Sequence, residues 1–188
     1  TDALLSNTTG AYNSAFGQDA LGSNTTGNHN TALGRATLYT NSTGSNNTAI
    51  GYNALNANQT ANDNTGIGYR TLVANTTGYS SVGIGNSALG SNTTGFQNVA
   101  VGMFALTSNT TAQRCNAFGF HALAANTTGN YNCAFGTWAL DAVTTGSKNV
   151  AMGYAALTDA TSDFNTAIGH EALKSATTGE QNTAVGHD

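Results

Sequence analysis

The chain has 188 residues, of which only 7% are charged, and its formal net charge at pH 7 is −4. Its five basic residues lie far apart, which argues against a nucleic-acid role because phosphate binding requires concentrated lysine and arginine. No apolar run approaches the ~20 residues of a membrane-spanning helix, so we expect no membrane insertion in this section.

Small polar residues dominate the composition. The chain contains 31 threonines, 25 asparagines and 23 glycines, and it has no proline. Such a composition is found in disordered polar tracts. However, 39% of the residues are hydrophobic and recur at fixed positions, which a disordered tract does not need. We therefore expect the chain to be ordered.

A repeat of 17 residues runs through the whole chain, with the unit N-x-A-Φ-G-x-x-A-L-x-x-N-T-T-G-x-x, where Φ is a large apolar residue. The leucine recurs from Leu4 to Leu173, and one residue is missing near Asp163. The Φ position is filled by Phe16, Leu33, Ile50, Ile67, Ile84, Val101, Phe118, Phe135, Met152, Ile168 and Val185. The glycine after Φ is present in all eleven copies, which are Gly17, Gly34, Gly51, Gly68, Gly85, Gly102, Gly119, Gly136, Gly153, Gly169 and Gly186.

A unit of 17 residues is too short for a helical hairpin repeat, which needs more than about 30 residues. It suits one turn of a β-solenoid, in which short strands separated by tight corners stack on themselves at ~4.8 Å. The sequence therefore predicts an all-β fold, a parallel β-solenoid of eleven 17-residue turns. We expect residues 1–188 to form a single uncapped repeat array, a section of a longer fibre, because solenoids normally need atypical capping repeats.

Each turn begins with an asparagine that we expect to form an amide ladder along the rod, satisfying the buried turns. This ladder comprises Asn13, Asn30, Asn47, Asn64, Asn98, Asn132, Asn149, Asn165 and Asn182. Ser81 and Cys115 interrupt it. The glycine after Φ predicts a corner that needs a positive φ or a close backbone approach. The second glycine position accepts Ala61 and Ala112, so we expect less strain there.

Two pairs of apolar neighbours occur in each turn, an Ala-Φ pair such as Ala100-Val101 and an Ala-Leu pair such as Ala105-Leu106. Successive strand residues point to opposite faces, so one member of each pair would be left outside the coil. Either the corners turn both residues inward, or the outer residues form a second face that identical chains bury. We favour the second interpretation.

The motif N-x-A-Φ-G, as in NTAIG (47–51) and NVAVG (98–102), resembles the head repeats of trimeric autotransporter adhesins. The longer phrase NTTGxxNTAxGxxAL resembles repeat arrays of phage tail-fibre-like and other bacterial surface fibre proteins. The resemblance covers essentially all of the chain. It implies a β-roll or β-prism built as an intertwined or side-by-side homotrimer, located outside the cell on a cell surface or a virion fibre.

The asparagine before the threonine pair starts an N-x-S/T triplet, the acceptor signal for N-glycosylation. The candidate attachment sites are Asn7, Asn24, Asn41, Asn58, Asn75, Asn92, Asn109 and Asn126. The alternative is that Asn-Thr-Thr is turn chemistry, with side chains bonding nearby backbone. The last three turns replace this asparagine with Val143, Ala160 and Ala176.

The threonine pairs, such as Thr93-Thr94, also suggest an ice-binding solenoid, which orders water on a flat threonine face. Such a face requires threonine on alternate residues, because adjacent side chains diverge. The adjacent pairs therefore disfavour this interpretation.

Metal binding and disulfide formation have weak support in the sequence. His170 and His187 lie one turn apart beside Glu171, but two histidines and one carboxylate predict a surface pair rather than a metal site. Cys115 and Cys133 are 18 residues apart, one turn plus one residue, so we expect them to point to opposite faces as free thiols.

Aromatic residues recur after the invariant glycine, and with Trp138 they could line a ligand groove or pack across a chain interface. They are Tyr52, Tyr69, Phe120 and Tyr154.

No catalytic grouping of Ser, His, Asp or Cys converges in the repeat, so we expect no enzyme activity, no metal and no cofactor. The sequence predicts a structural and adhesive section of an extracellular fibre. Its expected partners are identical chains, in a homotrimer or filament, and surface glycans or a host-cell receptor. The alternatives are a glycan-coated self-assembling filament and an ice-binding solenoid.

Overall fold

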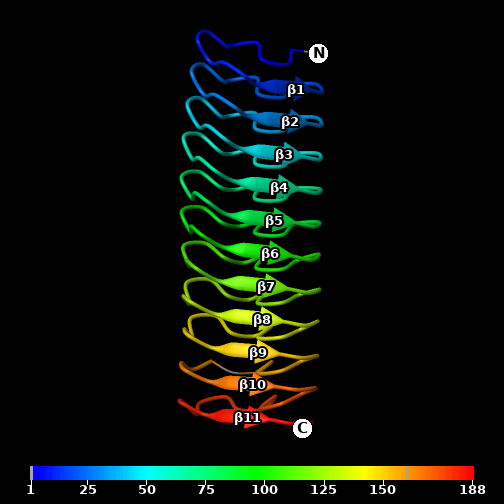
Figure 1. Ribbon diagram of the computed structural model, residues 1–188, viewed down its shortest axis with the longest axis vertical. Helices are drawn as coiled ribbons and strands as arrows, with labels where there is room; N and C mark the ends of the chain where they lie inside the picture. The colour runs from blue at the N-terminus through cyan, green and yellow to red at the C-terminus, as the bar shows by residue number, and fades with distance from the viewer. Residues whose placement is uncertain (1, 160) are drawn as a thin grey trace.

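The computed structural model describes residues 2–159 and 161–188, which form a straight rod with the termini at opposite ends (Figure 1). One strand of three residues occurs in each turn, and all eleven strands join one parallel sheet in the order β1 to β11. The described residues contain no helix, and hence none long and apolar enough to cross a membrane. The strands are β1 (Ser14–Phe16), β2 (Thr31–Leu33), β3 (Thr48–Ile50), β4 (Thr65–Ile67), β5 (Val82–Ile84), β6 (Val99–Val101), β7 (Asn116–Phe118), β8 (Cys133–Phe135), β9 (Val150–Met152), β10 (Thr166–Ile168) and β11 (Thr183–Val185).

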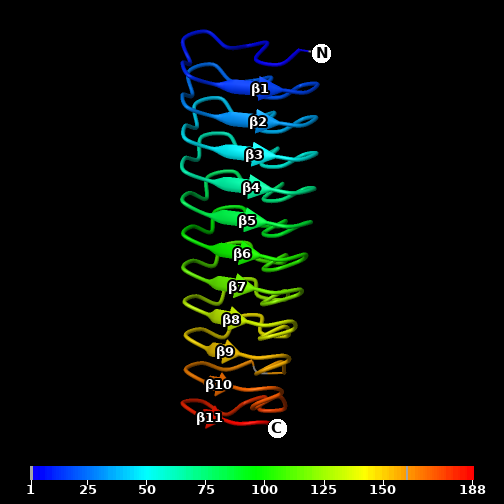
Figure 2. The ribbon, with the colours of Figure 1, turned by 45° about the vertical axis from the view of Figure 1, so that its right-hand side comes forward.

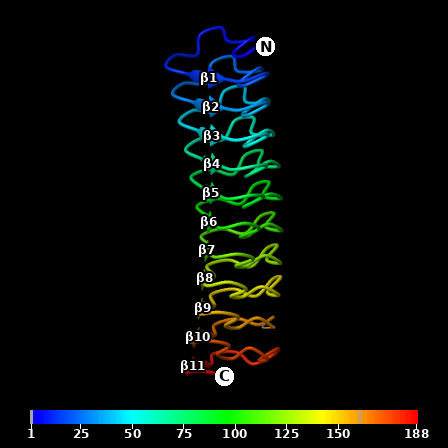
Figure 3. The same cartoon turned by 90° about the vertical axis from the view of Figure 1, so that its right-hand side faces the viewer.

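Each strand pairs with the same positions of the next turn, so that Ala15 lies beside Ala32 and Phe16 beside Leu33. The register survives the missing residue near Asp163, because Val150 of β9 still pairs with Thr166 of β10. Figures 2 and 3 show that the stack turns gradually about its long axis. The predicted parallel β-solenoid with a 17-residue turn is therefore confirmed.

The corner after each strand needs glycine for two reasons. The eleven glycines have φ between 122° and 150°, a region that side chains disfavour. A Cβ atom at Gly51 would also lie 2.5 Å from the carbonyl oxygen of Gly68 in the next turn. The corner thus has both the positive φ and the close backbone approach that the sequence predicted.

The Ala-Leu pair turns inward as a whole, which differs from the favoured interpretation. Ala105 and Leu106 are both 0% exposed. Leucine achieves this by adopting a left-handed backbone, with φ between 49° and 57° in all eleven turns. That conformation costs about 1–2 kcal/mol per residue, whereas burying a leucine side chain contributes about 1.5–3 kcal/mol. The leucine N–H also donates to a carbonyl of the next turn, at 3.0 Å from Leu106 to Ala122.

Two further positions in each turn have a positive φ without glycine, and Ser80 is one of them, with a φ of 53°. Its side chain is exposed, so Ser80→Gly should relieve backbone strain without losing packing. We expect a gain of about 0.5–1 kcal/mol, measured as a higher melting temperature. Ser91 is exposed and has no positive φ. Ser91→Gly should therefore be neutral or destabilising, and an equal gain from both changes would contradict the strain argument.

Candidate interaction surface

The outer side of the sheet carries two parallel columns of side chains, which we call the sheet face. The middle residue of each strand is an alanine or glycine, buried in β2 to β10 as at Ala100 and half-buried in the two terminal strands, so the two residues beside it point outward. The apolar column is the Φ column of the sequence, and Leu33, Phe135 and Met152 in it are 45%, 38% and 46% exposed. The flanking column consists of Ser14, Thr31, Thr48, Thr65, Val82, Val99, Asn116, Cys133, Val150, Thr166 and Thr183.

The sheet face is uncharged over its full length. None of the chain's five basic and nine acidic residues falls in either column. No side chain of the apolar column is buried, and the column continues through all eleven turns. A contiguous exposed apolar patch of this kind is typical of an interaction site. The predicted outer apolar stripe is therefore present at the Ala-Φ pair and absent at the Ala-Leu pair.

The asparagines of the Asn-Thr-Thr triplets are inside the coil. From Asn24 to Asn126 their side chains are 0% exposed, and Asn7 is half-buried. From Asn24 onward, each Nδ2 donates to the Oδ1 of the equivalent asparagine one turn earlier, at 2.9 Å from Asn41 to Asn24 and 2.8 Å from Asn92 to Asn75. The same Nδ2 donates to the carbonyl of the second corner, at 2.9 Å from Asn92 to Gly95.

This burial corrects the glycosylation prediction for the folded rod. A glycan on Nδ2 would have to occupy the packed interior and would break the bonds between turns. The correction covers Asn24, Asn41, Asn58, Asn75, Asn92, Asn109 and Asn126, and Asn7 uses its Nδ2 to donate to Gly10. These residues form a second amide ladder, which the sequence reasoning missed.

The first asparagine ladder links successive turns through the backbone. The Oδ1 of Asn47 accepts the backbone N–H of Asn64 at 3.0 Å, and its Nδ2 donates to the carbonyl of Ala61 at 2.8 Å. Ser81 and Cys115 keep part of this pattern, since the Oγ of Ser81 accepts from the N–H of Asn98 at 3.2 Å. No buried side-chain nitrogen or oxygen lacks a partner in the part of the chain that the structure describes. The two ladders therefore satisfy the polar interior.

The hydroxyl of the first threonine of a pair donates to a backbone carbonyl of the next turn at Thr8, Thr25, Thr76, Thr93, Thr110 and Thr127. The hydroxyls of Thr93 and Thr110 donate to the carbonyls of Thr110 and Thr127, at 3.0 and 3.1 Å. The second threonine, as at Thr94, is exposed. The pairs thus leave a single exposed threonine column rather than a flat face of alternating hydroxyls.

The two cysteines are free and differ in environment. Cys115 is buried in the first ladder position, where its thiol donates to the carbonyl of Gly129 at 3.2 Å. Burial raises the pKa of the Cys115 thiol to about 11, so it is uncharged at neutral pH. Cys133 lies in the flanking column of the sheet face and is half-buried. The predicted opposite orientation of the two thiols is confirmed.

The histidine pair lies near the C-terminal end of the rod. The rings of His170 and His187 stack at 4.8 Å with an interplanar angle of 4°. Asp188, rather than Glu171, completes a group whose ligand atoms lie within 4.8 Å of one another, and all three residues are exposed. Glu171 instead accepts a hydrogen bond from Lys174 Nζ at 2.7 Å, which lowers its pKa. Face-to-face rings direct their nitrogens in parallel rather than toward one ion.

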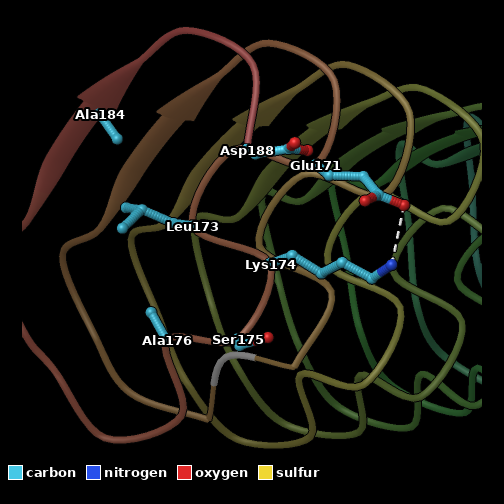
Figure 4. Close-up of a pocket in the computed structure, with 7 residues that line it drawn as sticks. All are labelled: Glu171, Leu173, Lys174, Ser175, Ala176, Ala184 and Asp188. Atoms are coloured by element: carbon cyan, nitrogen blue, oxygen red, sulfur yellow. Dashed lines mark hydrogen bonds and ion pairs between the residues drawn. The ribbon is translucent and has the colours of Figure 1, made fainter.

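A cavity of about 430 Å³ opens at the same end of the coil. Figure 4 shows Leu173, Ala176 and Ala184 pointing into it, while Glu171 and Lys174 pair along its side. Leu173 and Ala184 belong to the core columns of the repeat. The cavity is therefore the interior of the coil itself rather than a separate ligand cleft.

The predicted aromatic residues fall into two groups. Tyr52 and Tyr69 stack at 5.5 Å in the N-terminal half of the rod. Phe120, Trp138 and Tyr154 follow one another in the C-terminal half, with ring centroids 6.1 and 5.4 Å apart. All five rings are exposed by 36% to 49%.

Comparison with known proteins found no match for this chain, neither a protein-family model, nor a curated protein, nor a solved structure.

Proposed function

We propose that the chain is a structural section of an extracellular fibre that assembles with identical chains through the sheet face. The observation that carries this proposal is the unbroken apolar column from Phe16 to Val185, which lies outside the coil. Its only direct neighbours on the face are uncharged, so two copies can approach without desolvating a charge.

The size of the apolar column supports self-association. A stable interface buries about 800 Å² on each partner, and the apolar column offers a partly or fully exposed side chain in each of the eleven turns. Because the column repeats once per turn, a second copy in parallel and in register would place apolar side chains against apolar side chains over the whole rod. Each turn of such an interface should add a similar amount to the free energy of association, as each repeat adds a similar amount to the stability of a repeat protein.

The number of chains and the location come from the resemblance of N-x-A-Φ-G to adhesin head and tail-fibre repeats. On that basis we propose a homotrimer displayed on a cell surface or a virion fibre, with a mechanical and adhesive role rather than a catalytic one. The buried amides of the Asn-Thr-Thr triplets disfavour a glycan-coated filament. The hydroxyls that donate to backbone carbonyls disfavour an ice-binding face built on the threonine pairs.

The proposal is tested by the mass of the protein in solution. We expect the unaltered chain to sediment near three times its 19.0 kDa. The triple variant Ile67→Thr, Ile84→Thr and Val101→Thr should sediment as a single chain, because it makes the middle of the apolar column polar while keeping residues suited to strands. A thiol reagent should also modify Cys133 faster in this variant, whereas buried Cys115 should resist in both proteins.

Val73→Thr is the matched control, because Val73 is half-buried and lies outside the sheet face. It should leave the mass and the Cys133 modification rate unchanged. A stable 19.0 kDa monomer of the unaltered chain across micromolar concentrations would overturn the proposal.

A further inference from the structure

Seven exposed or half-buried rings form a continuous strip along one edge of the C-terminal half of the rod. This aromatic strip consists of Phe104, Phe120, His121, Trp138, Tyr154, His170 and His187. Successive ring centroids are 4.4 to 6.1 Å apart, from the Phe104–His121 contact to the His170–His187 contact. Every one of six consecutive turns therefore contributes at least one ring.

The aromatic strip is a local departure from the repeat. The equivalent positions of the five preceding turns hold only two rings, Tyr52 and Tyr69, among residues such as Arg35, Arg70 and Asn86. A surface along which identical rods assemble over their whole length recurs in every turn, as the apolar column does. A feature confined to half of the rod is instead typical of a binding site for a separate ligand.

The ring geometry favours a ligand that lies along the rod. Trp138 is turned by 69° and 71° from its neighbours Phe120 and Tyr154, and it is 37% exposed. Its ring is therefore not covered face-to-face by either neighbour. The negative face of an aromatic ring attracts polarised C–H groups, such as those on the flat side of a pyranose. The ring centroids of Phe120, Trp138 and Tyr154 are 6.1 and 5.4 Å apart, similar to the length of one sugar unit in an extended chain.

Charge beside the strip selects among sugars. Asp141 lies 3.7 Å from His121, and Glu171 and Asp188 lie near the last two rings, where Lys174 pairs with Glu171. Carboxylates accept hydrogen bonds from sugar hydroxyls, but this excess of negative charge repels an anionic polymer.

We propose that the aromatic strip binds a neutral, extended polysaccharide along the rod. One sugar ring packs on the face of Trp138, and the neighbouring sugars contact the rings of Phe120 and Tyr154, which are turned by 69° and 71° from it. This inference deepens the proposed adhesive fibre function, on which it rests for its setting, by naming the class of ligand.

The test uses Trp138, the only tryptophan in the chain, as a fluorescent reporter at the centre of the strip. We expect its emission to change on titration with a β-1,4-linked glucose hexamer or a β-1,4-linked N-acetylglucosamine hexamer, and not with an anionic hyaluronan oligomer. Tyr154→Asn should weaken binding at least about tenfold. Asn86 occupies the equivalent position of another turn, so asparagine fits the backbone there.

Tyr52→Asn is the matched control, because it removes an exposed ring at the equivalent position outside the strip, and it should leave binding unchanged. No response of Trp138 to either neutral hexamer at about 1 mM, or an equal response to hyaluronan, would overturn the proposal. Sedimentation of the same samples separates the two proposals. The Tyr154→Asn variant should lose affinity for the sugar but keep the mass of the assembly. The triple threonine variant of the apolar column should sediment as a single chain but still bind the sugar.

Discussion

Replacing Gly102 with alanine is expected to destabilise the central turns of the rod by about 3–5 kcal/mol. Gly102 has a φ of 133°, which a residue with a side chain rarely adopts. A Cβ atom there would also collide with the backbone carbonyl of Gly119 in the next turn. Because that carbonyl belongs to another invariant corner, it cannot move without displacing the turn beyond it.

Gly95→Ala is the matched control for Gly102→Ala. Gly95 lies at the second corner, where a Cβ atom would also collide with a backbone carbonyl, that of Ala112 in the next turn, but where φ is not positive. Ala61 and Ala112 occupy the equivalent position of other turns, so the two changes share the close approach and differ in φ. The asparagine of the triplet still bonds the corner carbonyl at those alanines, at 3.1 Å from Asn58 to Ala61 and 3.3 Å from Asn109 to Ala112, against 2.9 Å from Asn92 to Gly95. We expect a loss of only about 1 kcal/mol, measured by denaturant unfolding. Equal losses at the two corners would contradict the argument from φ.

The position of the change along the rod matters as much as its chemistry. Each turn contacts only its neighbours, so the stability of the rod is close to a sum over turns and the interfaces between them. Gly102→Ala is therefore expected to uncouple the two halves and produce two unfolding transitions. The same change at Gly17, close to one end, should fray a short segment and leave one main transition.

The period of the sequence was sufficient to predict the fold and the strand register. Glycine after Φ located the strained corner, because few other residues adopt that φ. The sequence contains no comparable sign that both side chains of the Ala-Leu pair point into the coil. Leu106 has a φ of 50° without any glycine or asparagine to signal it, because the stacked turns and the burial of leucine impose that conformation.

The second amide ladder had a sequence signal that the glycosylation motif obscured. The asparagine of the triplets is replaced by Val143 and Ala176 in later turns, and an apolar replacement is typical of a position inside the coil. Val143 is indeed 0% exposed. The aromatic strip was only partly predictable, because ring contacts between turns depend on side-chain orientation.

Replacing Asn92 with aspartate should destabilise the rod by about 2–4 kcal/mol at neutral pH, although the two side chains have nearly the same shape. Asn92 Nδ2 donates to Asn75 Oδ1 at 2.8 Å and to the Gly95 carbonyl at 2.9 Å, and a carboxylate can donate to neither. The Asn75 Oδ1 and the Gly95 carbonyl oxygen would then both face the buried negative charge of the new carboxylate. Burial and these acceptors should raise the pKa of the new carboxyl group well above its unfolded value.

The pH dependence of Asn92→Asp gives a sharper test than the loss itself. When the folded pKa is raised, the folded state binds the proton more tightly than the unfolded state, so the deficit relative to the unaltered chain should shrink as the pH falls through the raised pKa. Denaturant unfolding at a series of pH values measures this deficit. Asn86→Asp, at an exposed position, should show no such recovery. A deficit that stays constant with pH would mean that packing, rather than hydrogen-bond donation along the ladder, holds the turns together.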